Sequence, residues 1–168
     1  DLPSSLRWHF IGHLQKNKVR KVLPFTEKIH SVDSLDIAKR INSIAHELGL
    51  FPKIYIQVNH AKESTKFGFS AEELSRSFDS LMQLDRIEIE GLMAIPPFDS
   101  DPENVRPEFA ALRKLRDELE QKHDIKLPGL SRGMSNDFHV AIEEGSTSVR
   151  IGSSIFGKRK VIKPNQNE

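Results

Sequence analysis

The chain has 168 residues, which suits a single domain with one sizeable hydrophobic core. Its 25 Lys and Arg residues nearly balance its 24 Asp and Glu residues, and the formal net charge of +1 argues against a nucleic-acid-binding protein with a broad basic face. Cysteine is absent, which excludes disulfides and thiol catalysis, and no apolar run is long enough to span a bilayer. We therefore expect a soluble cytoplasmic protein with no signal peptide and no membrane partner, and we interpret the basic cluster at 158–160 as a solvated end.

Short apolar runs alternate with amphipathic helical segments along the whole chain, which is typical of βαβ units and a parallel sheet. The predicted strands, in order, cover residues 8–12, 28–32, 53–59, 91–95, 127–131 and 148–152. The predicted helices lie around 17–21, from Asp33 or Ser34 to Gly49, from the capping box at 70–73 onward, around 109–119, over about 136–144, and from Ser154.

Six strands in strict alternation with helices fit either a doubly wound sheet or a (β/α)₈ barrel. A complete barrel has about 250 residues, or roughly 30 per unit, so six units predict about 190 residues. The observed 168 residues fit an α/β barrel that lacks about two units. We expect the first two strands to be the absent ones, because the chain opens almost directly into a strand, and we treat residues 1–168 as one domain.

Two consecutive loops near the C-terminus carry a glycine followed by a hydroxyl residue. Gly133 and Ser135 follow the fifth predicted strand, and Gly152 and Ser153 follow the sixth. Each loop enters a predicted helix, whose first N–H groups attract an anion, and the loops after the last two strands of a barrel are a recurrent phosphate site. Plain helix capping is the alternative for either loop alone, whereas two such loops side by side favour a phosphate or sulfate site.

Arg150 lies in the last predicted strand, between Val149 and Ile151. Alternation puts the two apolar side chains on the face that packs against helices, so Arg150 points into the barrel. A buried guanidinium needs a partner. That partner is either an internal carboxylate or a bound anion or acceptor atom, and spacing alone does not choose between them.

A series of motifs in a fixed order covers nearly the whole chain. The motifs lie at 8–15, 17–18, 30–34, 58–59, 63–68, 91–95, 130–138 and 145–157, and they include His-Ser-Val-Asp-Ser, Gly-Leu-Met-Ala-Ile and Ser-Val-Arg-Ile-Gly-Ser-Ser. Through them the chain resembles the pyridoxal-phosphate homeostasis family, single-domain barrels similar to the N-terminal domain of bacterial alanine racemase.

The resemblance implies pyridoxal 5′-phosphate as cofactor and a set of residues that contact it. Ser135, Gly152 and Ser153 would hold the phosphate, and Arg150 would donate to the pyridine nitrogen. His9 or Phe10 would line the ring pocket, and Met93 would be an inner barrel residue that touches the cofactor. Gly133 and Met134 would also belong to the set of cofactor-binding residues. Alternation does not decide whether His9 or Phe10 faces inward.

The chain departs from the family pattern at two points. Arg132 stands where the family usually has methionine, and we expect its side chain to point to solvent rather than to attract the phosphate. The Schiff-base lysine of the family lies on the first barrel strand, in a stretch that has no counterpart here. Lys66 belongs to a different motif, so we assign no catalytic residue to this chain.

The resemblance implies a cofactor carrier that balances pools of pyridoxal phosphate, acting as a monomer or a weak homodimer. The alternatives are an amino-acid racemase or related enzyme, and a truncated barrel that keeps only an anion site. A racemase needs a second base, usually a tyrosine from a partner domain, and the only tyrosine, Tyr55, lies mid-strand. His9 and His13 straddle a strand end, so we expect no metal there.

Overall fold

The computed structural model describes residue 3, residues 5–59 and residues 67–157. One sheet of six strands has the order β1-β2-β3-β4-β5-β6, and every neighbouring pair is parallel. The strands are β1 (His9–Phe10), β2 (Lys28–Val32), β3 (Lys53–Val58), β4 (Glu88–Ala94), β5 (Gly129–Met134) and β6 (Ser148–Arg150). A sequential order excludes a doubly wound sheet, in which the strand order reverses at a switch point, and gives a half-barrel.

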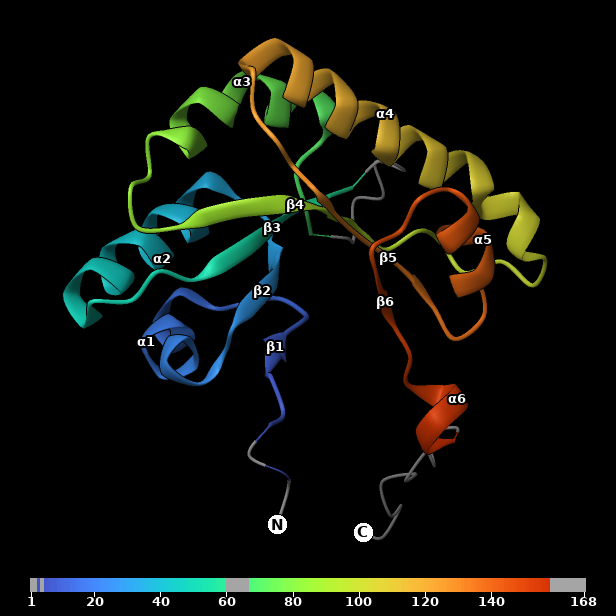
Figure 1. The fold of residues 1–168 in the computed structure, drawn as a ribbon, viewed down its shortest axis with the longest axis horizontal. Coiled ribbons are helices and arrows are strands. Elements are labelled where there is room, and N and C mark those ends of the chain that lie inside the picture. Colours follow the sequence, from blue (N-terminus) through green and yellow to red (C-terminus); the bar gives the residue numbers. More distant parts are fainter. Residues whose placement is uncertain (1–2, 4, 60–66, 158–168) are drawn as a thin grey trace, which may run out of the picture.

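The helices follow the strands in alternation and lie on the outer side of the curved sheet (Figure 1). They are α1 (Val19–Val22), α2 (Leu35–Leu48), α3 (Ala71–Met82), α4 (Arg106–His123), α5 (Phe138–Glu143) and α6 (Ser153–Phe156), with 3₁₀ turns at Lys16–Lys18, Leu23–Phe25 and Pro102–Val105. The last two α-helices have only 6 and 4 residues, so their macrodipoles are small.

Local side-chain chemistry sets the ends of the long helices. The Ser34 hydroxyl accepts the N–H of Ile37 at 3.3 Å and starts α2, which ends at Gly49 in the left-handed conformation (φ 66°). Ser70 and Glu73 form the predicted capping box at the start of α3, with bonds of 3.1 and 2.9 Å.

The two faces of the sheet have different chemistry. On the outer face, residues such as Ile54 and Leu92 join one apolar core with Phe78 of α3 and Leu112 of α4. On the inner face, Tyr55 is buried but does not belong to that core, and it lies among polar side chains. The outer core therefore holds the helices on the sheet, while the inner face is left for polar groups.

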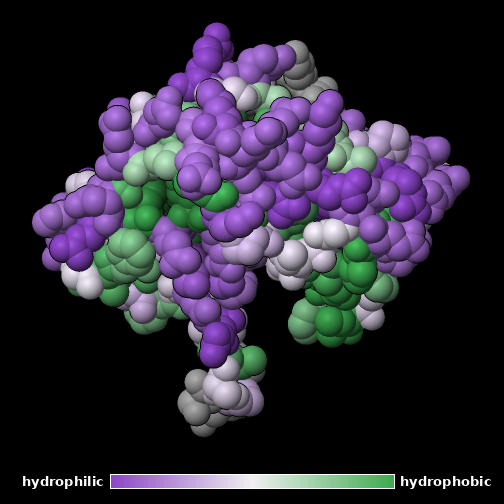
Figure 2. Space-filling view, turned by 45° about the horizontal axis from the view of Figure 1, so that its top comes forward, coloured by the Kyte–Doolittle hydropathy of each residue, from purple (hydrophilic) through white to green (hydrophobic). Residues whose placement is uncertain are grey.

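β1 and β6 are the two edges of the sheet, and they lie on the same side of the molecule as both ends of the described chain (Figure 1). Large apolar side chains are exposed next to these edges: Trp8 and Ile11 beside β1, and Ile155 and Phe156 in α6. Figure 2 shows hydrophobic side chains gathered over α6, at the lower right. No helix within the described residues is long and apolar enough to cross a bilayer.

β5 continues further than the sequence predicts. The prediction ended this strand at Ser131, but it extends to Met134, which pairs with Arg150 of β6 after a register shift. Gly133 has φ +93°, and a Cβ there would lie 2.7 Å from Cβ of Ala141. Glycine thus allows α5 to approach the strand closely while the strand continues past it.

Candidate functional site

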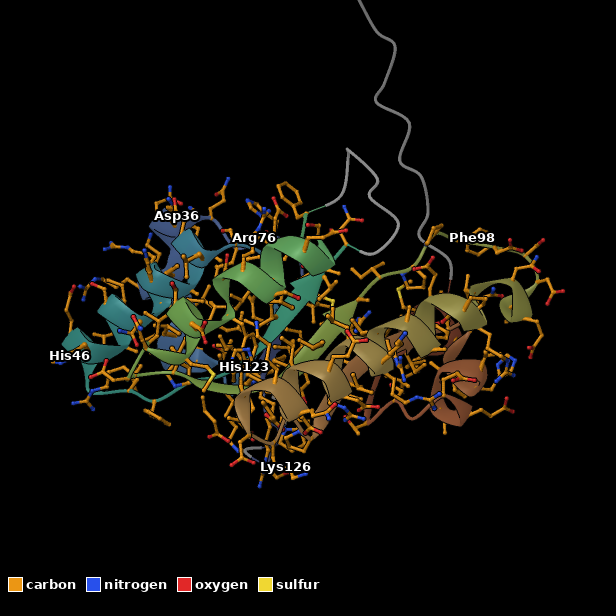
Figure 3. The ribbon with its side chains drawn as sticks, turned by 90° about the horizontal axis from the view of Figure 1, so that it is seen from above. Asp36, His46, Arg76, Phe98, His123 and Lys126 are labelled. Atoms are coloured by element: carbon orange, nitrogen blue, oxygen red, sulfur yellow. The ribbon has the colours of Figure 1, made fainter. Side chains whose placement is uncertain are left out.

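A cavity of about 830 Å³ lies at the carboxyl ends of β1, β4, β5 and β6. Figure 3 shows this edge of the sheet: Asp36 in the first turn of α2 and Phe98 before α4 lie along the upper edge, whereas His46 and His123, near the ends of the same helices, lie opposite. Among the residues that line the cavity are seven predicted site residues: His9, Met93, Met134, Ser135, Arg150, Gly152 and Ser153.

Ser135 connects the two predicted phosphate loops. Its hydroxyl oxygen accepts the backbone N–H of Gly152 at 3.2 Å and that of Ser154 at 3.3 Å. Ser153 is exposed at the first position of α6 and lines the cavity. The sequence predicted the loops but not the contribution of Ser154, which follows the Gly-Ser pair and has no signal of its own.

The loop after β5 is a tight turn and not the helix N-cap that the prediction assumed. Asp137 is the N-cap residue of α5, so Ser135 precedes the helix. The Asp137 carboxylate accepts the N–H of Met134 at 2.6 Å, and the N–H of Asp137 bonds back to the carbonyl of Met134 at 3.1 Å. This turn directs Ser135 toward the loop after β6 and not along its own helix.

Arg150 points to the inside of the sheet, as alternation predicts. Its Nη1 donates to the hydroxyl of Ser131 at 2.7 Å and its Nη2 to the carbonyl of Ala94 at 3.0 Å. The sequence left the partner open between a carboxylate and an acceptor atom, and the structure provides two neutral acceptors. Burial lowers the pKa of Arg150 to about 10, while Asp137 acts in the opposite direction, so the guanidinium stays charged at neutral pH.

The structure decides which residue of β1 faces inward. His9 lines the cavity, whereas Phe10 packs against the outer apolar core and does not line it. Met93 is fully buried on the inner side and also lines the cavity. Gly133 is buried against α5 and is not one of the lining residues. Phe10 and Gly133 therefore pack against the outer core and α5, and neither lines this cavity.

His30 and Ser131, two inner residues that the sequence analysis did not select, complete the site. His30 is 2% exposed, and its Nδ1 lies 2.7 Å from the hydroxyl oxygen of Ser131, while its Nε2 lies 3.0 Å from Nδ1 of His9. The imidazole of His30 also stacks on the ring of Tyr55, with centroids 4.5 Å apart. Burial lowers the pKa of His30 to about 4, with smaller effects from His9, Arg150 and other neighbours, so the ring is neutral at pH 7. The sequence signal that could have selected His30 was its place in a predicted strand, where alternate side chains face the inside of the sheet.

The prediction for the side chain of Arg132 was wrong. It was expected to point to solvent, but it is fully buried between the sheet and the outer helices. Its Nη2 donates to the carbonyl of Glu144 at the end of α5, and its guanidinium lies 5.6 Å from the ring centroid of Phe109. Among the described residues, Nε and Nη1 of Arg132 have no hydrogen-bond partner. Arg132 faces away from Arg150 and Ser131 because alternate residues of β5 point to opposite faces.

The remaining predictions concern Lys66, the basic cluster at 158–160, and His13. Lys66 and the basic cluster at 158–160 lie outside the described residues. His13 pairs with the carboxylate of Asp33 at 2.7 Å and stacks on Phe67.

Comparisons with known proteins point to one family. The family model for the N-terminal domain of alanine racemase matches residues 5–160. The pyridoxal phosphate homeostasis protein of Aquifex aeolicus is 46% identical over 155 residues, which are 92% of this chain and 68% of that protein. The protein of the same name from Synechocystis is 40% identical, over 92% of this chain and 71% of its own length. The structure of PipY from Synechococcus elongatus with PLP bound superposes with a TM-score of 0.84 at 39% identity, covering 93% of this chain and 72% of PipY.

Proposed function

The chain belongs to the pyridoxal phosphate homeostasis proteins and has the alanine racemase N-terminal type of domain, and from this we infer that it binds pyridoxal 5′-phosphate in the cavity beside β5 and β6. The observation that carries the proposal is the convergence of two backbone N–H groups, from Gly152 and Ser154, on the hydroxyl of Ser135. The relatives' names and the PLP-bound PipY structure support the identity of the ligand.

The phosphate would replace a weak acceptor by a strong one. A phosphate oxygen carries negative charge and forms shorter, stronger hydrogen bonds with N–H groups than a serine hydroxyl does. The hydroxyl of Ser135 would then donate its hydrogen to the phosphate. A Cβ at Gly152 would meet nothing within 4 Å, so this loop leaves room for an anion. With α6 only 4 residues long, these individual donors, and not a helix dipole, would hold the phosphate.

The ring would lie beside Arg150. A guanidinium only donates hydrogen bonds, and two of its donors are already committed to Ser131 and Ala94. A remaining N–H is available for the ring nitrogen of the cofactor. His9 and Met93 on the cavity wall would limit the position of the ring.

The residues around the cavity favour holding the cofactor over transforming amino acids. Bound pyridoxal phosphate supplies an electron-withdrawing ring, which is strongest when its nitrogen is protonated. Arg150 disfavours that proton, because a positive donor already faces the nitrogen. Tyr55 is 3% exposed and does not line the cavity, and burial together with Glu90 raises its pKa to about 12. It is therefore poorly placed as a second base, and we propose that the chain holds and releases the cofactor without robust catalysis.

We further propose that two more βα units complete the half-barrel to a (β/α)₈ barrel. The exposed apolar residues beside β1 and in α6 support this, as does the length of the relatives, of which this chain covers 68–71%. The added strands would pair with β1 and β6 and cover both open edges. The lysine that binds the cofactor covalently would lie on the first of them.

Calorimetric titration tests the cofactor assignment. We expect pyridoxal 5′-phosphate to bind and inorganic phosphate to compete for the same site. Pyridoxal, which has no phosphate group, should bind at least about tenfold more weakly, because the charge-assisted hydrogen bonds to the phosphate are lost. Equal affinities for inorganic phosphate and the cofactor would favour a bare anion site instead. Racemisation of alanine at rates typical of enzymes would favour the racemase alternative.

A further inference from the structure

A continuous row of hydrogen bonds crosses the inner face of the half-barrel from β6 to β1. It runs from Nη1 of Arg150 to Oγ of Ser131 (2.7 Å), from that oxygen to Nδ1 of His30 (2.7 Å), and from Nε2 of His30 to Nδ1 of His9 (3.0 Å). Ser131 is 0% exposed and His30 is 2% exposed, so water does not supply alternative partners for these atoms.

The direction of each bond follows from counting hydrogens. Arg150 can only donate, so the oxygen of Ser131 accepts from it. If Nδ1 of His30 also donated to that oxygen, the hydroxyl hydrogen of Ser131 would be buried without an acceptor, at substantial cost. The hydroxyl therefore donates to Nδ1 of His30. A neutral His30 then carries its hydrogen on Nε2 and donates it to His9.

This order makes the orientation of Arg150 depend on His30. The hydroxyl hydrogen of Ser131 points at His30, which leaves the serine lone pairs to face the guanidinium. The ring of His30 is itself held between Tyr55, 4.5 Å away, and His9, 5.0 Å away. Nδ1 of His30 is thus a rigid acceptor for the hydroxyl of Ser131, because residues of β1 and β3 hold the His30 ring of β2 in place.

We propose that His30 is a positioning residue: its Nδ1 fixes the hydroxyl of Ser131, which holds the guanidinium of Arg150 in the orientation that meets the ring nitrogen of the cofactor. This inference rests on the proposed function, because it takes pyridoxal 5′-phosphate as the ligand. It goes further in assigning recognition of the ring to β2 and β5, apart from the phosphate loops. Affinity for the phosphate group should then be independent of His30.

The test compares two substitutions of the same size. Asn and Leu have nearly the same shape, and both remove the imidazole ring, but only His30→Asn places an acceptor near the position of Nδ1. For each variant, Kd is measured for pyridoxal 5′-phosphate and for the analogue whose ring nitrogen is replaced by carbon. Inorganic phosphate is titrated separately, and it reports whether the phosphate loops are intact.

We expect the unsubstituted chain to prefer pyridoxal 5′-phosphate over the carbon analogue by about tenfold or more, the size of a hydrogen bond from a charged donor. His30→Asn should keep that preference and His30→Leu should reduce it to near unity, with the Kd for inorganic phosphate unchanged in both. If His30→Leu does not fold, His30→Phe, which keeps a flat ring but has no acceptor atom, takes its place and should give the same loss of preference, while Ser131 and its bond from Arg150 stay unchanged.

The remaining outcomes contradict the proposal. If both variants at position 30 keep the preference, His30 does not position Arg150. If both lose it, the stacked ring and not the acceptor atom is what matters. If the unsubstituted chain binds the cofactor without preferring it over the carbon analogue, the proposed cofactor binding stands and the inference fails. If the cofactor does not bind at all, the proposed function fails and the inference fails with it.

Discussion

The hydroxyl oxygen of Ser135 lies 3.2 Å from the backbone nitrogen of Gly152, so the loop after β5 and the loop after β6 meet at one atom. The same oxygen accepts the N–H of Ser154. Neither loop has a long helix behind it, because α5 and α6 have 6 and 4 residues. In the proposed phosphate site, affinity would therefore depend on this small set of aligned donors and would be sensitive to single substitutions.

Removing the hydroxyl of Ser135 should weaken phosphate binding without unfolding the chain. Ser135→Ala deletes one donor to the phosphate, and we expect affinity for both pyridoxal 5′-phosphate and inorganic phosphate to fall about tenfold or more, measured by calorimetric titration. Ser77→Ala in α3, away from the cavity, is the matched control and should change neither affinity. Unaltered binding by Ser135→Ala would place the phosphate elsewhere.

Alanine substitution should reduce stability at one glycine and phosphate binding at another. At Gly133 a new Cβ would lie 2.7 Å from Cβ of Ala141 with the backbone at φ +93°, so Gly133→Ala should lower the free energy of unfolding by about 2–4 kcal/mol. At Gly152 the Cβ would meet nothing within 4 Å. Gly152→Ala should leave stability within about 0.5 kcal/mol and weaken phosphate binding, because the methyl group occupies open space beside the donors. Urea denaturation and phosphate titration of both variants check this pair.

Replacing the buried Arg132 by methionine should stabilise the fold or leave it unchanged. Two nitrogen atoms of this guanidinium have no partner among the described residues, and burial lowers its pKa to about 10. Arg132→Met removes that desolvation cost while retaining contact with Phe109, so we expect a gain of about 0–2 kcal/mol by urea denaturation. Arg132→Ala leaves a cavity and should lose about 2–4 kcal/mol. A large loss with methionine would show that the bond to Glu144 outweighs the desolvation.

Stability should fall as the pH is lowered from 6.5 toward 4. The pKa of His30 is about 4 in the folded chain, whereas an unfolded chain leaves it at its ordinary value of 6.5, so between these values the unfolded chain binds the extra proton. The contribution of His30 is fully present above pH 6.5 and is lost through this window, amounting to roughly 1–3 kcal/mol after allowance for partial solvent screening. Urea denaturation at pH 7.5, 6 and 5 measures the slope. His30→Asn should make it shallower, and an identical slope in that variant would assign the effect to other groups.

Equimolar pyridoxal 5′-phosphate and borohydride should leave this chain without a stoichiometric covalent adduct. The resemblance to the family implies that its covalent lysine would lie on a strand with no counterpart in this sequence, and that Lys66 would belong to a different motif. Intact-mass measurement after reduction is the readout, and peptide mapping identifies any modified lysine. A single adduct on Lys66 would contradict the assignment of no covalent residue to this chain.

Those parts of the fold that depend on local chemistry could be predicted from the residue order. Capping at Ser34 and Ser70, the glycine at the end of α2, and the alternation that turns Arg150 inward all depend on neighbours within a few residues along the chain, so they can be read from it. Six alternating strands and helices, the two glycine–serine loops and the ordered motifs were enough to predict the family.

The partners that these residues contact depend on how distant segments of the chain pack together. Arg132 was expected in solvent, but α4 and α5 close over its side of β5 and bury it. Alternation puts His9 and Phe10 on opposite faces without deciding which of them faces inward. In the β1–β2 ladder Phe10 pairs with Ile29 of the outer core, which leaves His9 on the inner face beside His30. Ser131 and His30 are 101 positions apart in sequence yet share a hydrogen bond. Such contacts depend on how distant strands pack, and the free energy of that packing is a property of the whole half-barrel and not of any local pattern.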